Sequence, residues 1–348
     1  MQSNHTPPSR VDYPGAKWWR VDFHTHTPHS TDAYRTGGTP NIADREWLLA
    51  HMRMGIDAVC VTDHNGGGQI DPLKAALVEL EVESPRDSDY RPLTLFPGVE
   101  ITTSDDIHLL AIFGPEATGS AISALLGQVG LQGGAEGDHE NQLQKGLKEI
   151  LDQIHPPNCD CIFLPAHVNG PRGLIRDGNA RVKEDALKHA ALYALECSWN
   201  GTVDWTAETE PVEERANKEF AVTYGSDSHQ VAQVGRKTSW VHMEEATLDG
   251  LRIALLDGKG SVEEFTQGGQ PGPPTNKWLR RIHIEKSKYL GRVESISLEL
   301  NPGLNAIIGG RGSGKSTILE ILRKTFNRSE ENGTNLRGLI VSFSVRKA

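Results

Sequence analysis

The chain has 348 residues, of which 37% are hydrophobic and 24% charged, and its net charge is −10 at pH 7. This length and composition predict a soluble globular protein with one large domain and a smaller addition, and they argue against a disordered chain. The four cysteines are too few for a disulfide framework, and the sequence contains no apolar run of about 18 residues that would predict a membrane-crossing helix.

Charge is distributed unevenly along the chain. Residues 277–348 contain 14 Lys and Arg against 6 Asp and Glu, a net of +8, which leaves −18 for residues 1–276. The acidic N-terminal part suits cation binding, and the basic C-terminal part suits binding to phosphate groups. The start, MQSNHTPPSR, lacks the basic and apolar stretches of a secretion signal, so we expect a cytoplasmic location without membrane contact.

Short apolar runs alternate with segments of helical period, a pattern typical of βα repeats and a largely parallel sheet. The predicted strands are, in chain order, Trp19–Phe23, Ala58–Thr62, Leu95–Ile101, His108–Phe113, Cys161–Ala166, Ala194–Cys197, Ala221–Tyr224 and Ser239–Met243. The predicted helices are Asp44–Met54, Glu140–Ile154, Arg181–Ala191 and Leu248–Leu256. Together they favour a barrel or a wound sheet.

The stretch TQGGQPGPPTNKW, residues 266–278, is too rich in Gly and Pro to lie inside an element, so we expect a linker there. It divides the chain into an N-terminal tail (1–17), a large domain (18–265), the linker (266–278) and a C-terminal segment (279–348). After it, three short strands are predicted at Ile282–Ile284, Ile296–Leu300 and Ala306–Ile308.

Polar residues cluster where the predicted strands end. They are His24, His26, Asp63, His64, Glu100, His167, Asp227 and His229, and His108 opens a further strand. In a βα barrel the strand ends converge on one face, so these residues are expected to meet in one pocket. An H-x-H pair on a strand also points both imidazoles to the same side, which suits a shared cation.

The motifs HTH, TDHN, PGVE, the following His108, PAH and SDSH, in this order, resemble those of the PHP (polymerase and histidinol phosphatase) family. The resemblance covers about residues 18–265. It implies an α/β fold, a distorted (β/α)7 barrel, with two or three divalent metals (Zn, Mn or Fe) that hydrolyse phosphate esters through a metal-activated water.

The resemblance also implies a ligand set. One cation would bind His24, His26, Glu100 and Asp227; a second, bridged by Glu100, would bind His108 and His167; a third would bind Asp32, His64 and His229. Asp63 would orient its neighbours. His29 matches no ligand position, and we expect surface or packing roles for His5, His51, His139, His155, His189, His242 and His283.

Phosphate needs cationic contacts besides metals. Arg172 and Arg176 follow His167, and Arg236 follows the SDSH motif, so these three are candidate phosphate-binding residues; the alternative is that they are solvated loop residues. The cysteines are expected to be structural, although Cys159 and Cys161 form a C-x-C pair of a kind that can bind metal.

The segment LNAIIGGRGSGKSTILEIL contains the G-x-x-x-x-G-K-[ST] pattern between an apolar run and a helical period. It predicts an ATP and Mg²⁺ site in which backbone N–H groups surround the phosphates, the lysine reaches the β and γ oxygens and the serine binds the metal. Its residues are Gly309, Gly310, Arg311, Gly312, Ser313, Gly314, Lys315, Ser316 and Thr317.

This loop resembles ATPase heads of the ABC and SMC kind, and about 70 residues are too few for a complete one. The missing part would follow in a longer protein or come from a partner or a second copy of the chain. The combination resembles TrlF-like PHP-ATPase proteins, which implies a phosphorylated substrate (DNA, RNA or nucleotide) and a role in DNA repair or phage defence.

Two alternatives stay open at the sequence level. The barrel could be a regulatory, non-catalytic module attached to a DNA-associated ATPase, or it could hydrolyse C–N bonds, because other βα barrels use similar ligand sets.

Overall fold

The computed structural model describes residues 14–131, 133, 136–153, 160–198, 219–266, 271, 277–285, 294–326 and 340–347. The described residues of 17–271 form one compact unit, and those of the C-terminal segment, with residues 14–16, form another. The predicted domain and linker boundaries stay predictions.

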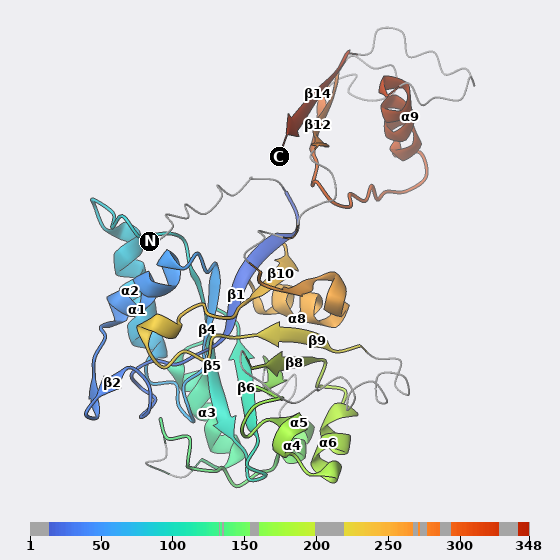
Figure 1. Ribbon diagram of the computed structural model, residues 1–348. Helices are drawn as coiled ribbons and strands as arrows, with labels where there is room; N and C mark the ends of the chain where they lie inside the picture. The colour runs from blue at the N-terminus through green and yellow to red at the C-terminus, as the bar shows by residue number, and fades with distance from the viewer. Residues whose placement is uncertain are drawn as a thin grey trace. The chain divides into compact units, whose positions relative to one another are not determined.

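The first unit mixes strands and helices (Figure 1). Its strands are β1 Lys17–Thr25, β2 Arg35–Thr36, β3 Thr39–Pro40, β4 Ala58–Val61, β5 Thr94–Thr102, β6 His108–Phe113, β7 Cys161–Pro165, β8 Ala194–Cys197, β9 Ala221–Tyr224, β10 Ser239–Met243 and β11 Val262–Glu264. Its helices are α1 Asp44–Arg53, α2 Ile70–Val82, α3 Gly119–Val129, α4 Leu147–Gln153, α5 Leu174–Asp177, α6 Ala180–Leu187 and α8 Leu248–Asp257, with 3₁₀ turns at Val231–Gln233 and Gly258–Gly260.

A seven-stranded curled sheet has the order β11-β10-β1-β4-β5-β6-β7. Strands β8 and β9 form a separate parallel pair. β8 contacts the edge strand β7, and β9 contacts β11 at the opposite edge of the sheet. The mixed α/β class is therefore confirmed, but the expectation of a largely parallel sheet is wrong: only β1-β4 and β4-β5 are parallel in the seven-stranded sheet. The pair β5-β6 is antiparallel because β5 turns directly into β6 without an intervening helix. The count of seven βα units stays a prediction.

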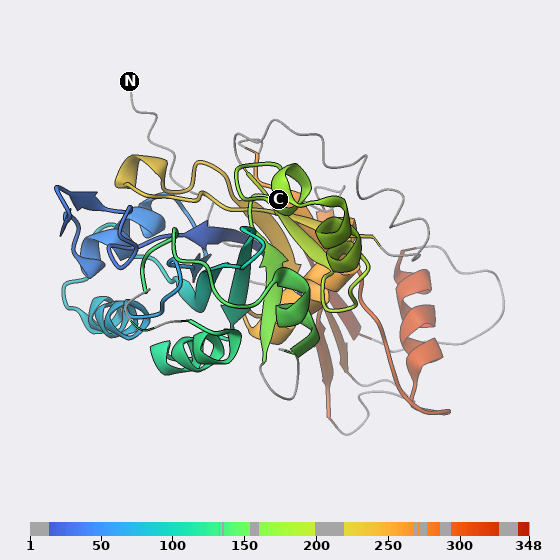
Figure 2. The same ribbon diagram turned by 90° about the horizontal axis from the view of Figure 1, so that it is seen from below.

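Both faces of the sheet are buried, which explains why its strands are continuous apolar runs. On β4, Ala58 and Cys60 belong to an inner cluster with α8, whereas Val59 and Val61 belong to an outer cluster with α1, α2 and α3. Figures 1 and 2 show α1, α2 and α3 together on one side of the strands. This packing fixes the strands and hence the positions of the residues at their ends.

Most predicted strands match the structure to within two residues, but the helices differ more. The helix expected at Glu140–Ile154 begins only at Leu147, because the preceding residues make other backbone contacts: Leu143 N–H donates to the carbonyl of Thr102 in β5 at 2.8 Å. The Asp105 carboxylate then accepts from Leu147 N–H at 2.7 Å and caps the helix start. Helices α2 and α3 were not predicted.

The helix expected at Arg181–Ala191 runs from Ala180 to Leu187 instead, because the Asn179 side chain caps its start. The described cysteines, Cys60, Cys161 and Cys197, are buried, in agreement with structural roles, and Cys159 lies outside the described residues. None of the helices in the described ranges combines the length and apolar character that a bilayer crossing requires.

The second unit contains β12 Lys277–Glu285, β13 Ile296–Glu299, α9 Lys315–Thr325 and β14 Ile340–Lys347. Its sheet has the order β13-β12-β14, and Ile282 and Ile284 of β12 form a small core with Ile318 and Ile321 of α9. The strand expected at Ala306–Ile308 is absent from these described residues: the segment pairs with no described strand, and Ile308 is 93% exposed. A β-strand needs a neighbour for its backbone hydrogen bonds.

Candidate metal centre

The polar residues named from the sequence lie at one edge of the curled sheet. His24 lies in β1 and His26 directly follows it, while Glu100 lies near the end of β5. His108 is at the first position of β6, yet it reaches the same edge because β6 runs antiparallel to β5 and pairs with Thr102 there. The edge is therefore formed by the carboxyl ends of the parallel strands β1, β4 and β5 and by the amino end of β6.

Backbone pairing continues past the ends of the strands and holds the loops in place. Asn65 N–H donates to the Glu100 carbonyl at 2.9 Å, and Glu100 N–H donates to the Asp63 carbonyl at 3.0 Å. Asp227 N–H donates to the His24 carbonyl at 2.7 Å. Asp227 also adopts a positive φ of 46°, a conformation that costs energy in a non-glycine residue and that persists at functional sites when surrounding contacts enforce it.

Glu100 is the centre of the site, with 1% of its surface exposed. Its Oε2 lies 3.1 Å from His24 Nε2, 3.4 Å from His26 Nε2 and 3.0 Å from His64 Nδ1. Its Oε1 lies 2.6 Å from His108 Nδ1 and 3.1 Å from His167 Nε2. One carboxylate thus faces five imidazoles from four segments of the chain.

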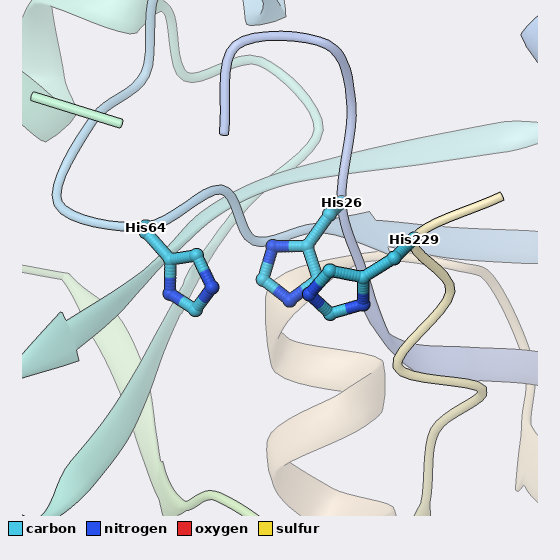
Figure 3. Close-up of side chains that lie close together, drawn as sticks. All are labelled: His26, His64 and His229. Carbon is cyan, nitrogen blue, oxygen red and sulfur yellow. The ribbon is translucent and has the colours of Figure 1, made fainter. Parts of the chain in front are cut away.

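Two further carboxylates lie beside His26 and His64 and beside a sixth imidazole, that of His229. Asp227 Oδ1 is 3.3 Å from His26 Nε2 and 3.6 Å from His229 Nδ1. Asp32 Oδ2 is 3.2 Å from His229 Nε2 and 3.6 Å from His64 Nε2. Figure 3 shows His26, His64 and His229 converging from three loops, with ring centroids of the first two 4.4 Å apart.

The charges of these groups are strongly coupled. Burial by itself would raise the pKa of Glu100, but the nearby His108, His24 and His64 imidazoles hold this pKa well below its usual range. Burial likewise opposes ionisation of Asp227, yet His24 and His26 keep its pKa low. Burial, assisted by His64 and His229, lowers the pKa of His26 to about 4. Anionic carboxylates and a neutral imidazole are the forms that bind cations.

The donor set fits divalent cations. Ligand atoms that share a cation at about 2.1 Å are separated by about 3.0–3.5 Å, which matches most of the carboxylate-to-imidazole distances above. The buried ring nitrogens His26 Nε2 and His64 Nδ1, which both face Glu100, have no hydrogen-bond partner among the described residues, which is uncommon for buried polar atoms unless a ligand binds them. Imidazole and carboxylate donors together suit Zn, Mn or Fe.

All nine predicted metal ligands lie in this cluster. The groups whose ligand atoms lie within 4.8 Å of one another are His26, His64 and His229; His24, His26 and Glu100; Asp32, His64 and His139; and His64, Glu100 and His108. A cavity of about 420 Å³ opens onto the cluster and is lined by Asp32, His64, Glu100, His108, His139, Glu140, His167, Pro171, Arg172, Ser198, Asp227 and His229.

Asp63 holds the loop that follows β1. Its carboxylate accepts from Thr27 N–H at 2.7 Å, from the Thr27 hydroxyl at 2.6 Å and from the Ser30 hydroxyl at 2.7 Å. Ser30 Oγ in turn lies 3.2 Å from His26 Nδ1. A proton on Nδ1 leaves the Nε2 lone pair directed at Glu100 and Asp227, so Asp63 orients the His26 ring.

The three candidate arginines differ in position. Arg172 lines the cavity, but its guanidinium donates to the His139 carbonyl at 2.7 Å and pairs with Glu140 and Asp106 at 3.0 and 3.3 Å. Arg236 donates to the carbonyls of Ser226 and Asp227 at 2.6 and 2.8 Å, which holds the Asp227 loop. Arg176 lies 3.6 Å from Asp177 and, like Arg236, is not among the described residues that line the cavity.

Two residues of the site were not predicted. Glu196, at the end of β8, is buried; it accepts hydrogen bonds from His167 N–H and from Gly225 N–H, and it lies 3.6 Å from His24 Nδ1. The feature of the sequence that could have indicated Glu196 is a charged residue inside the otherwise apolar run ALEC. His139, expected on the surface or in packing, instead lines the cavity beside Asp32.

The glycine-rich loop of the second unit leads into α9. Gly314 precedes the helix at φ 90° and Gly312 has φ 84°, conformations that favour glycine. The Lys315 ammonium folds back over the loop and donates to the carbonyls of Gly309 and, at 2.8 Å, Gly310. The lysine therefore lies over the loop where a bound phosphate is expected.

Residues 281–340 match the family description "AAA domain". No curated protein matches the chain. A two-domain protein with a predicted PHP-like metal-dependent phosphoesterase from Bacteroides vulgatus is 14% identical and has a TM-score of 0.48, with 86% of this chain and 88% of that chain covered.

Two further solved structures are similar. Endonuclease Q, in complex with a duplex that carries an abasic lesion, is 18% identical with a TM-score of 0.49, over 71% of this chain and 58% of that chain. A putative metal-dependent phosphoesterase from Bifidobacterium adolescentis is 16% identical with a TM-score of 0.40, over 68% and 96%. At such identities and TM-scores, the function of this chain has to be argued from its own site.

Proposed function

We propose that the unit of residues 17–271 is a metal-dependent phosphoesterase of the PHP type that acts on nucleotides or nucleic acids. The observation that carries this proposal is the buried Glu100 carboxylate, which faces five imidazoles with spacings suited to shared cations. Purely structural histidine clusters have no comparable need for three carboxylates at the same point.

The predicted ligand groups divide around Glu100. We propose one position between His24, His26, Glu100 and Asp227, and a second between Glu100, His108 and His167. We propose a third position toward Asp32, His64 and His229. When bound there, divalent cations supply an activated water and offset the charge of the phosphoryl group.

The chain's own residues then hold the parts of the reaction in place. Asp63 and Glu196 orient His26 and His24, and Arg236 holds the Asp227 loop. Arg172 is the only one of the three candidate arginines that lines the described cavity, so we propose it for contact with substrate phosphate once Glu140 and Asp106 yield to that anion.

We propose that the C-terminal segment binds ATP and Mg²⁺ at Gly309–Thr317 and that nucleotide binding is coupled to the phosphoesterase. The match to an AAA domain over residues 281–340 and the fold of Lys315 over the loop support nucleotide binding. The TrlF-like assignment, a role in DNA repair or phage defence, and a longer chain or partner that completes the ATPase belong to the same proposal.

The test is hydrolysis by the purified chain of p-nitrophenyl phosphate, bis(p-nitrophenyl) phosphate and short DNA and RNA oligomers, with Mn²⁺ or Zn²⁺ and after chelation. We expect metal-dependent hydrolysis of at least one phosphoester. Asp227→Asn should lower kcat/KM by about 100-fold or more, because loss of residues that merely orient metal ligands already costs about 10–100-fold.

The matched control is Asp249→Asn, which changes a carboxylate on the surface of α8, where 82% of the side chain is exposed. This variant should hydrolyse like the wild type. Wild-type activity in Asp227→Asn, or no hydrolysis of any phosphoester by a wild-type protein loaded with metal, would contradict the proposal. Cleavage of C–N bonds alone would point to the alternative hydrolase.

A further inference from the structure

His139 lies at the rim of the cavity, outside the motifs that predicted metal binding. Its Nδ1 is 3.5 Å from Asp32 Oδ2, and its ring centroid is 5.2 Å from that of His64. Asp32, His64 and His139 each offer one ligand atom, and these atoms all lie within 4.8 Å of one another. The three residues therefore form a group of the size that one cation needs.

The distances between these ligand atoms fit a shared cation better than they fit direct hydrogen bonds. His139 Nδ1 and His64 Nε2 lie 3.5 and 3.6 Å from the same Asp32 oxygen, which is long for a hydrogen bond. Ligands at about 2.1 Å from a tetrahedral cation lie about 3.4 Å apart. His139 Nδ1 also has no hydrogen-bond partner among the described residues, although it is buried.

Glu140 sets the orientation of the His139 ring. Its Oε1 lies 2.8 Å from His139 Nε2, so a proton on Nε2 points to Glu140 and the Nδ1 lone pair points to Asp32. A carboxylate on the far nitrogen of a histidine is the usual partner of a metal-binding imidazole, because it fixes the tautomer and raises the basicity of the ligand nitrogen.

The backbone of residues 137–141 is tied to the loops that carry the other two ligands. Gly137 N–H donates to the His64 carbonyl and Thr31 N–H donates to the Gly137 carbonyl, both at 2.8 Å. A Cβ on Gly137 would lie 2.4 Å from the His29 carbonyl oxygen, so only glycine allows this approach.

Side chains hold the same segment from two more directions. The Asn65 amide donates to the carbonyls of Asp138 and Asn141 at 2.9 and 2.8 Å. The His139 carbonyl accepts from Arg172 at 2.7 Å and from the Thr102 hydroxyl at 3.0 Å. These contacts fix the position of the loop and so hold His139 at the cavity, as a metal ligand requires.

We propose that His139 is a metal ligand that binds, with Asp32 and His64, the outermost cation of the cavity. The inference deepens the proposed function, on which it rests for the presence of cations, and it adds a ligand that the sequence motifs do not contain. Arg172 then acts at this site as a positioning residue through the His139 carbonyl.

The test replaces His139 with cysteine in the full chain and uses Co²⁺ as the probe. A thiolate bound to Co²⁺ gives a strong charge-transfer absorption in the near ultraviolet, and a thiol that only lies nearby does not. We expect this band in His139→Cys and neither in the wild type nor in His189→Cys, a control on a histidine that pairs with Asp152 away from the cavity.

A second measurement counts bound cations and does not depend on the spectrum. His139→Asn and Asp32→Asn should each weaken the most weakly bound Co²⁺ by about tenfold or more, and the double variant should lose little beyond the single ones, because both remove the same cation. His189→Asn should bind like the wild type.

The outcomes separate the two proposals. A wild-type Co²⁺ content and affinity in His139→Asn, with no thiolate band in His139→Cys, would overturn the role of His139 and leave the phosphoesterase untouched. Cations that bind through His139 in a protein that hydrolyses no phosphoester would overturn the function and leave the ligand. A wild-type chain that binds no Co²⁺ would overturn both.

Discussion

His51 is a fully buried histidine of α1 that lies outside the metal centre. Its Nδ1 is 2.8 Å from the Trp47 carbonyl, its Nε2 has no hydrogen-bond partner among the described residues, and its ring lies 3.9 Å from that of Trp47. Burial lowers the pKa of His51 to about 4, so the folded protein keeps this ring neutral. The unfolded chain binds the proton at about pH 6.5.

This difference predicts a loss of stability in acid. Because the unfolded state binds more protons, the contribution of His51 is intact above about pH 6.5 and falls as the pH drops toward 4, by about 2 kcal/mol at pH 5. Relative to the wild type, His51→Gln should therefore gain about this much free energy of unfolding between pH 7.5 and 5, as measured by urea denaturation.

One control for His51 is the wild type itself, measured at the same pH values. A second control is Gly127→Ala, in which no titratable group changes, and its free energy of unfolding should run parallel to that of the wild type across the same pH range. Parallel pH curves for the wild type and His51→Gln would show that the buried ring does not titrate as described.

At the same scale, the sequence predicted most of the candidate site. A charged or imidazole side chain that directly follows an apolar run has no packing reason to be there, which singled out residues such as His26, Glu100 and Asp227. His139 could not be predicted this way, because it follows no strand and its segment is held at the cavity by tertiary contacts such as those with Asn65 and Arg172. Tertiary contacts of this kind leave no local pattern.

At the scale of elements, the end of β9 approaches β1 so closely that only glycine fits between them. A Cβ on Gly225 would lie 2.4 Å from His24 Cβ and 2.6 Å from His24 N. Gly225→Ala should push these segments apart and lower the free energy of unfolding by about 1–3 kcal/mol. It should also weaken cation binding, because His24 lies in β1 and Asp227 follows β9. Urea denaturation and metal titration measure both effects.

Gly127→Ala is the matched control for that substitution. Gly127 lies on the exposed side of α3, and a Cβ there would meet nothing within 4 Å. Alanine favours helix over glycine, so this variant should be more stable than the wild type by about 0.5–1 kcal/mol, with unchanged metal affinity. A shift of equal sign and size in both variants would contradict the proposed contact.

Strands were predicted better than helices, and the reason is local. A buried strand such as β4 is a short apolar run bounded by polar residues, whereas α4 begins seven residues later than its periodicity suggested because Leu143 pairs with Thr102. The apolar run at Ala306–Ile308 has strand composition but no strand beside it in the described chain. Composition predicts a strand only where a partner is available.

At the scale of the whole molecule, the curled sheet is what makes one site from dispersed residues. Ligands from residue 24 to residue 229 meet because β8 and β9 lie beside the two edges of the seven-stranded sheet. The sequence predicted this convergence from strand ends but not the antiparallel pairs β5-β6 and β6-β7, since strand direction depends on how the chain returns. The basic second unit, with its glycine-rich loop, is a separate compact unit.

The most direct test of the metal centre is anomalous X-ray diffraction from crystals of the protein grown with Mn²⁺ or Zn²⁺. We predict anomalous peaks on both sides of the Glu100 carboxylate, one within bonding distance of His24, His26 and Asp227 and one within bonding distance of His108 and His167. Crystals that contain the metal elsewhere, with no peak beside Glu100, would contradict the account.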